Sequence, residues 1–184
     1  MEGLCLDVLN SDWHDWKTAG PGVDRLTEPQ FRKDILARWQ LDPALAADER
    51  AWRSLAALRA RLRTAAEHLV AGGLQSADVA HLNGVLARRA WWRRLEASEG
   101  GYRLALAPVR PAAGADELLW RTAASFAETV AGEGAARLKV CANPDCRWVF
   151  YDESRNLSRR WCEAATCGNL MKVRRFRSRR REQA

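Results

Sequence analysis

The sequence predicts a mainly α-helical protein with a small β-hairpin, followed by a C-terminal module built on four cysteines that ends in a basic helix. Three observations support this fold class. Apolar residues recur at helical spacing in several segments of the first 135 residues. Four of the five cysteines form two close pairs near the C-terminus, and arginine dominates the last residues. We therefore expect a mostly helical domain over residues 1–135 and a small module over residues 136–184.

The first segments of the chain are short. Residues 4–10 form an apolar run whose periodicity does not decide between a helix and a buried strand. Residues 18–28 are rich in glycine, proline, aspartate and threonine, which predicts a loop. Thr27 and Gln30 make a capping box. It precedes a short amphipathic helix whose apolar residues follow at i, i+4 and i+8: Phe31, Ile35 and Trp39.

Residues 44–71 are the clearest helix. Their apolar residues repeat at spacings of three, four or seven, and Gly72 follows the last of them. Five arginines lie mainly off this stripe and are expected to be solvated: Arg50, Arg53, Arg59, Arg61 and Arg63. Ser76 can cap the next helix, in which three side chains are expected to turn inward: Val79, Leu82 and Leu86.

The predicted hairpin consists of residues 89–96 and 102–107, which flank a loop that carries two glycines. Trp91 and Trp92 would point to opposite faces of it, so one of them can be exposed to a partner. Residues 116–131 predict the last helix of the domain, through an apolar series that consists of Leu119, Ala123, Phe126 and Val130.

The C-terminal cysteines follow the pattern Cys141-x4-Cys146-x15-Cys162-x4-Cys167. Two close pairs separated by a loop suit a tetrahedral zinc ion, because each pair supplies two thiolates from one tight turn. Four protein ligands leave no position for water or substrate, so we expect one structural Zn²⁺ rather than a catalytic one. The stretches 138–140 and 148–151 suit two short strands around the first pair, and Trp148, Phe150 and Trp161 would form a small core.

Other uses of these cysteines are less consistent with the pattern. A thioredoxin-type redox site would need C-x-x-C, which is absent. The N-terminus lacks the features of a signal peptide, so we expect a cytoplasmic protein, in which disulfides are disfavoured. The three histidines lie far from the cysteines in sequence. Cys5 sits in an apolar run and is expected to be a small buried residue.

The segments Cys141 to Asn156, Ser158 to Cys162 and Cys167-Gly168-Asn169 resemble the CGNR zinc finger, a bacterial family. In that family the finger follows an N-terminal ABATE domain, which often opens with a Leu-Asp-x-x-Asn stretch. Residues 6–10 here are similar. The resemblance implies a stress-induced transcription regulator that binds DNA through the finger. It departs from the family pattern at Leu170, where the fourth signature residue is an arginine.

The net charge of +7 is confined to the end of the chain. Residues 147–184 carry 11 Lys and Arg against four acids, which leaves residues 1–146 neutral. A neutral body with a basic end suggests an acidic polymer as partner, most simply nucleic acid, and a solvated basic tail is the alternative. Residues 168–182 can continue as a helix from the last cysteine. The candidate DNA contacts are basic residues of this module: Arg159, Arg160, Lys172, Arg174, Arg175, Arg177, Arg179, Arg180 and Arg181.

Two other partners stay open. RNA or another single strand would favour aromatic side chains interleaved with arginine. The module, stabilised by zinc, could instead bind a protein, and the basic helix would then contact an acidic partner. Separately, some arginines could pair with acids of the N-terminal domain or of a second subunit. A palindromic DNA target would imply a homodimer.

The N-terminal domain carries seven of the nine tryptophans. Most should be core or interface residues, although some could line a pocket for a small-molecule effector. We expect no enzymatic activity, because the sequence has no nucleophile elbow, P-loop, dinucleotide fingerprint or HExxH motif. No apolar stretch is long enough to suggest a membrane partner.

Overall fold

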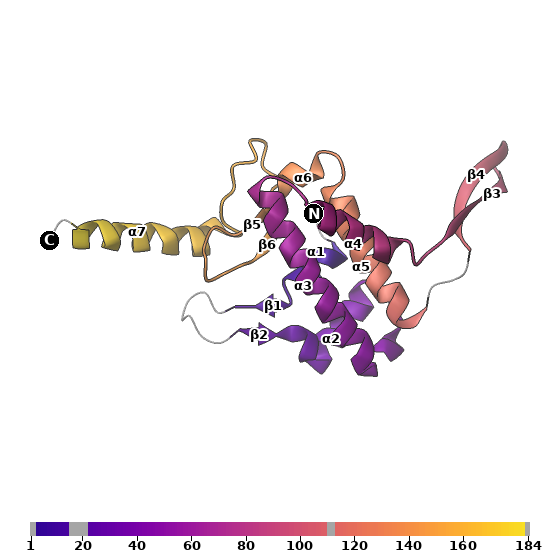
Figure 1. The fold of residues 1–184 in the computed structure, drawn as a ribbon, viewed down its shortest axis with the longest axis horizontal. Coiled ribbons are helices and arrows are strands. Elements are labelled where there is room, and N and C mark those ends of the chain that lie inside the picture. The colour runs from indigo at the N-terminus through magenta and orange to yellow at the C-terminus, as the bar shows by residue number, and fades with distance from the viewer. Residues whose placement is uncertain (1–2, 15–21, 110–112, 183–184) are drawn as a thin grey trace.

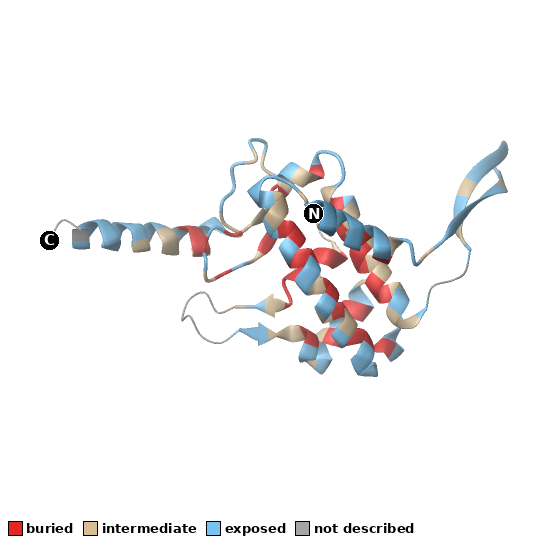
Figure 2. Ribbon diagram, in the orientation of Figure 1, coloured by how far each residue is buried: buried red, intermediate tan, exposed pale blue. Residues whose placement is uncertain are grey.

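The computed structural model describes residues 3–14, 22–109 and 113–182. Helices form a central body, from which a long β-hairpin projects at one end and a single helix at the other (Figure 1). Buried residues concentrate in the body, whereas the hairpin and the C-terminal helix are largely exposed (Figure 2). The mainly helical fold class with small two-stranded sheets is confirmed.

The helical body consists of five α-helices: α1 (Leu4–Leu9), α2 (Pro29–Arg38), α3 (Glu49–Ala71), α4 (Ser76–Leu86) and α5 (Gly114–Val130). The apolar run at the N-terminus is therefore a helix, with Cys5 fully buried. α3 and α5 pack against each other and α1 packs against both. Their apolar stripes meet in one core, whose largest fully buried side chains include Trp52, Leu55, Leu118 and Phe126.

Two helix starts differ from the prediction. Thr27 belongs to a 3₁₀ turn, η1 (Arg25–Thr27), and its hydroxyl donates to the carbonyl of Asp24, so the Thr27–Gln30 capping box is wrong. Pro29 starts α2 instead. The expected helix 44–71 is divided, because the carboxylate of Asp48 caps α3 by accepting from the N–H groups of Arg50 and Ala51. The residues before it form a second 3₁₀ turn, η2 (Pro43–Ala47).

The expected loop over residues 18–28 is partly ordered. Residues 18–21 lie outside the described residues, but β2 (Val23–Asp24) pairs with β1 (Asp12–Trp13) in an antiparallel ladder. The carboxylate of Asp24 accepts two hydrogen bonds from Arg59, at 2.6 and 2.7 Å. Arg59 was expected to be solvated, yet this bidentate pair draws it over the body and leaves its side chain 12% exposed.

The long hairpin is confirmed as β3 (Trp91–Ser98) and β4 (Gly101–Pro108), in an antiparallel register that pairs Trp91 with Pro108 and Ser98 with Gly101. At its base the ring of Trp91 lies 5.8 Å from that of Trp120 on α5. Within α4, Leu82 is buried as expected but Val79 is exposed, because the helix covers the body with only one narrow face.

The chain then enters the zinc module through α6 (Gly134–Arg137), and β5 (Leu138–Val140) pairs with β6 (Val149–Tyr151). These are the two short strands that the sequence predicted. Leu138 and Val149 are fully buried and belong to the core of the helical body. The proposed division near residue 135 stays a prediction, but the two parts of the chain share one apolar core.

The module ends in helical structure. A π-helical turn, η3 (Ala164–Gly168), leads directly into α7 (Asn169–Glu182), which confirms the expected C-terminal helix. α7 leaves the body and extends along the longest axis of the molecule (Figure 1). Its sequence offers no continuous apolar face that could hold it against the core.

Candidate metal centre and basic helix

The four C-terminal cysteines meet at one point. Their Sγ atoms all lie within 4.8 Å of one another. Cys162 Sγ is 3.7 Å from Cys146 Sγ and 3.7 Å from Cys167 Sγ. A tetrahedral zinc ion with Zn–S bonds of about 2.3 Å places its sulfur ligands about 3.8 Å apart. The spacing of this cluster therefore fits a tetrahedral zinc site without rearrangement.

The first pair of cysteines lies on a tight turn between β5 and β6. The N–H of Cys141 donates to the carbonyl of Trp148 at 2.8 Å, and the N–H of Cys146 donates to that of Asn143 at 3.0 Å. Arg147 then adopts a positive φ of 55°, which reverses the chain into β6. This backbone holds both thiols on the same side of the turn.

The second pair comes from the loop before α7 and from the π-helical turn itself. Cys162 precedes the turn, and Cys167 lies within it and is fully buried. Two N–H groups point at sulfur: Cys162 donates to Cys141 Sγ at 3.5 Å, and the side chain of Asn143 donates to Cys167 Sγ at 3.6 Å. Such donors stabilise thiolates, so the ligand set is prepared for a cation.

The thiols strongly affect one another's ionisation. Hydrogen bonds from Cys146 and Cys162 lower the pKa of Cys141 to about 2. The hydrogen bond to Cys141 raises the pKa of Cys146 to about 12, and contacts with Cys141 and Cys146 raise the pKa of Cys162 further. These three sulfurs therefore do not ionise together unaided, and a divalent cation in the cluster would stabilise them as thiolates.

Aromatic residues and one carboxylate surround the cluster. Phe150 is buried beside it, with Trp148 and Trp161 packed around it, which confirms the expected small core. Asp152 is also fully buried and accepts from the N–H groups of Ser154 at 3.0 Å and Arg159 at 2.9 Å. These bonds fold the long loop between the two cysteine pairs back onto the module.

The zinc module is tied to the helical body by polar contacts as well as by the shared core. The side chain of Asn10 forms two hydrogen bonds with the backbone of Val149. Arg63 of α3 donates to the carbonyl of Leu9 at 2.7 Å and to that of Arg147 at 2.5 Å. Arg63 is only 7% exposed, so its expected solvation is wrong, because two carbonyls at the junction need its donors.

The basic residues of the module do not all face solvent equally. Arg174 donates to the carboxylate of Asp145 at 2.5 Å, and the guanidinium of Arg159 stacks 4.9 Å from the ring of Phe150. These two are occupied within the module. Arg159 is nevertheless exposed, as are the remaining predicted contacts: Arg160, Lys172, Arg175, Arg177, Arg179, Arg180 and Arg181.

Three of the exposed residues share a groove. Lys172, Arg175 and Arg179 lie on one face of α7 and line a groove of about 170 Å³ together with Trp161 and Phe176. Arg160 lies over the ring of Trp161 at 5.5 Å. Basic side chains and two aromatic rings therefore line this groove, which starts beside the second cysteine pair.

Comparison with known families agrees with this geometry. A family described as "CGNR zinc finger" matches residues 137–180. The ABATE family, described as "Putative stress-induced transcription regulator", matches residues 2–133, well over half of the chain. The chain belongs to the ABATE family. No curated protein matches it.

Within this ABATE chain the four cysteines hold one structural zinc ion, as the spacing predicted. Zinc with four thiolates has no open coordination position, so its contribution here is to fix the fold of the module. No helix among the described residues is long and apolar enough to cross a membrane.

Three supporting residues were not predicted. Asn143, whose side chain donates to the sulfur of Cys167, is the first of them. Asn10 could have been singled out, since it ends the Leu-Asp-x-x-Asn stretch. Its partner Val149 could not, because it lies 139 residues away in the sequence. Arg63 carried no signal, because nothing local separates it from the exposed arginines of α3.

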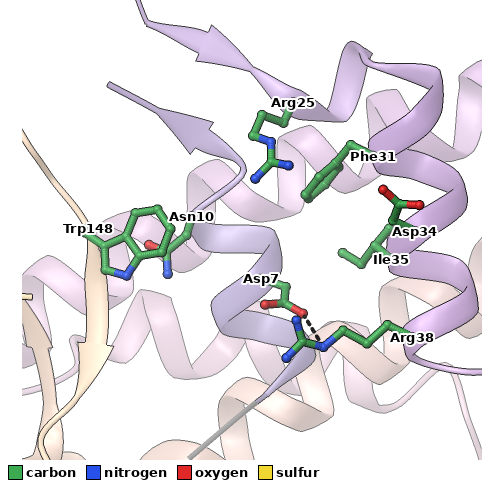
Figure 3. Close-up of a pocket in the computed structure, with 8 residues that line it drawn as sticks. All are labelled: Asp7, Asn10, Arg25, Phe31, Asp34, Ile35, Arg38 and Trp148. Carbon is green, nitrogen blue, oxygen red and sulfur yellow. Dashed lines mark ion pairs between the residues drawn. The ribbon is translucent and has the colours of Figure 1, made fainter. Parts of the chain in front are cut away.

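A pocket lies at the junction of the ABATE domain and the zinc module (Figure 3). It has a volume of about 210 Å³. Phe31 and Trp148 stand on opposite sides, and the guanidinium of Arg25 lies over the ring of Phe31, 4.4 Å from its centroid (Figure 3). Asp7 pairs with Arg38 at 3.5 Å along the remaining edge. The pocket is thus polar at its rim and aromatic on its walls, rather than purely apolar.

Proposed function

We propose that this protein is a non-enzymatic, DNA-binding transcription regulator whose zinc module presents α7 to the DNA backbone. The observation that carries the proposal is the position of α7. The helix begins at Asn169, directly after the turn that holds Cys167, and it projects from the body with most of its basic side chains in solvent. Zinc thereby fixes the base of this charged helix, and the pair of Arg174 with Asp145 holds the helix against the first cysteine turn.

The face formed by Lys172, Arg175 and Arg179 is the best candidate for the DNA contact. These side chains follow the helix at spacings of three and four, so they can meet successive phosphates along one strand. Arg160 extends the same basic surface onto the loop between the cysteine pairs. Because Arg159 and Arg174 already have partners, we assign them to the structure of the module rather than to DNA.

The salt dependence of binding tests this proposal. Affinity of the zinc-loaded chain for a randomised DNA duplex should fall linearly with salt on logarithmic axes. If six basic side chains each neutralise one phosphate, the slope is about −5. A slope near zero would contradict phosphate binding. If the expected slope is found, selection of the bound sequences identifies the preferred site.

One observation favours single-stranded nucleic acid as the second candidate. Phe176 is 62% exposed in the middle of the basic helix, and Trp161 lies in the adjacent groove. Exposed rings beside arginines can stack on unpaired bases. Competition of RNA and single-stranded DNA against the duplex separates the two candidates, since duplex binding through phosphates does not need these rings. Competition by an acidic protein alone would favour the protein-interaction alternative.

Regulation by a small-molecule effector would act most directly at the junction pocket. Arg25 can pair with a carboxylate and Asp34 can pair with an amine across its rim, while Phe31 and Trp148 provide flat apolar walls. Trp148 belongs to the zinc module, so a ligand between these walls would contact both parts of the chain. This predicts that ligands with separate acidic and basic groups raise the unfolding temperature, and that Arg25→Ala removes the effect.

A further inference from the structure

The projecting hairpin has two different faces. Side chains alternate along each strand, so Arg94 and Glu96 share one face with Arg103 of the partner strand. Glu96 accepts from Arg94 at 2.7 Å and from Arg103 at 2.5 Å. Trp92, which is 49% exposed, lies at the base of this face, and beyond it the ion pairs of Glu96 suit contact with water.

The opposite face is apolar and uncovered. Leu95 lies directly across from Leu104, and Tyr102 and Leu106 flank this pair on the same face. Their side chains are largely in solvent: Leu95 is 66% exposed, Leu104 61%, Leu106 67% and Tyr102 77%. Within the described chain, more than half of the large exposed apolar residues lie between positions 91 and 109.

An apolar ribbon of this kind is not stable in water by itself. Isolated two-stranded hairpins are marginal and become stable when an apolar face is packed. Only the base of this hairpin meets a described side chain of the body, through the contact of Trp91 with Trp120. Beyond that contact the strands extend away from the helices (Figure 1). The apolar face therefore has no cover among the described residues.

We propose that this face is a homodimer interface, in which the hairpin of a second copy packs face to face on the first. With Trp91 at the base, the exposed apolar side chains offer on the order of 600 Å², close to the roughly 800 Å² per partner that a stable interface buries. A patch of this size is at the upper end of the range for the largest apolar patch of a typical monomer, and such patches are often functional.

The face is also complementary to itself. At the base a large residue, Trp91, lies across from the small Pro108, and at the tip the small Ala97 lies across from the large Tyr102. A two-fold axis that sets the base of one hairpin against the tip of the other therefore matches large residues with small ones. Arg93, across from Leu106, is the one charged residue of this face, and its long side chain would extend past the apolar contact into solvent.

This interface leaves the basic helix free. The hairpin and α7 leave the body at opposite ends of the molecule (Figure 1). Two copies joined through their hairpins would therefore carry two copies of α7 at their outer ends. The dimer does not depend on DNA binding, and its failure would leave the proposed function of α7 intact.

Sedimentation velocity of the full zinc-loaded chain, over a range of concentrations, tests the interface. The wild-type chain should be a dimer. Leu104→Glu should raise its dissociation constant by roughly tenfold or more, because an ionised carboxylate then has to enter the apolar centre of the interface. Ala105→Glu is the matched control. It places the same side chain one residue further, on the polar face and across from Arg94, so this variant should remain a dimer.

Tyr102→Lys repeats the test at the most exposed position of the face, where a charge cannot disturb folding of the monomer. It should also favour the monomer, with an unchanged circular dichroism spectrum and zinc content. A wild-type chain that is monomeric at all concentrations overturns the proposal. A dimer that persists in both Leu104→Glu and Tyr102→Lys overturns it as well. Cosedimentation with uncharged lipid vesicles that Leu104→Glu abolishes would assign the face to a membrane surface and would equally overturn it.

Discussion

The side-chain amide of Asn10 pairs with both backbone groups of Val149, as a neighbouring strand would. Its Oδ1 accepts from the Val149 N–H at 2.8 Å, and its Nδ2 donates to the Val149 carbonyl at 2.9 Å. β6 follows the first pair of zinc ligands, so this contact fixes the zinc module on α1 of the helical body. Arg63 reinforces it from α3.

Replacement of Asn10 by alanine should destabilise the protein by about 3 kcal/mol, because both buried backbone groups of Val149 lose their partners. Urea unfolding measures this loss, and amide exchange at Val149 should accelerate. Asn83→Ala, at an exposed position of α4, is the control and should change stability by less than about 0.5 kcal/mol. Equal effects of the two variants would contradict a special role for Asn10.

Removal of zinc should destabilise the helical body as well as the zinc module. Leu138 and Val149 are part of the core of the body, and zinc holds the turn between their strands. We expect a strong chelator, or Cys162→Ser, to lower the unfolding temperature followed by the α-helical signal. Cys5→Ser keeps all four ligands and should leave the zinc content at one ion per chain. An unfolding temperature that does not respond to zinc would show that the two parts fold independently.

The Asp24–Arg59 pair predicts a pH dependence. Hydrogen bonds from Arg59 hold the pKa of the Asp24 carboxyl below its ordinary value. Its contribution to stability is therefore complete above the unfolded-state pKa of about 3.9 and is lost as the pH falls through the folded-state pKa. The stability difference between wild type and Asp24→Asn should stay constant from pH 7 to about pH 5 and shrink below about pH 4.

This difference should be no more than about 1 kcal/mol, because Asp24 is 37% exposed and solvent screens the pair. Denaturant titrations of both proteins over this pH range measure it. A difference that grows on acidification would mean that the folded-state pKa is raised rather than lowered.

Two arginines of α7 should respond differently to substitution. Arg179 is exposed in the basic groove, so Arg179→Ala should weaken DNA binding and reduce the magnitude of the salt slope by about 1. Arg174 is paired with Asp145, so Arg174→Ala should change the slope less. Anisotropy titrations at several salt concentrations give both values. Equal changes in slope would place both arginines on the DNA.

The sequence predicted those features that depend on local spacing. The apolar periodicity of α3 and α5, the glycines between β3 and β4 and the spacing of the cysteines each report on neighbours within one element or one turn. Helix starts were less certain, because Thr27 and Asp48 are both residue types that cap helices, yet Thr27 lies in a 3₁₀ turn and only Asp48 caps a helix.

The features that could not be predicted depend on contacts between distant segments. Asn10 and Val149 are far apart in sequence, and so are Arg63 and Arg147. A buried arginine looks like a solvated one when only its helix is considered, since its partners are carbonyl groups of other elements. The exposure of the apolar hairpin face was equally hidden, because alternation predicts two faces but not which of them the body covers.

The most direct test of the central claim compares the same duplex affinity before and after removal of zinc. Fluorescence anisotropy at fixed salt would be measured with the zinc-loaded chain, with the chelated chain, and after zinc is returned. The account predicts that chelation weakens binding by roughly tenfold or more and that zinc restores it, because the metal holds the base of α7. Binding that is absent from the loaded chain, or unchanged by chelation, would contradict it.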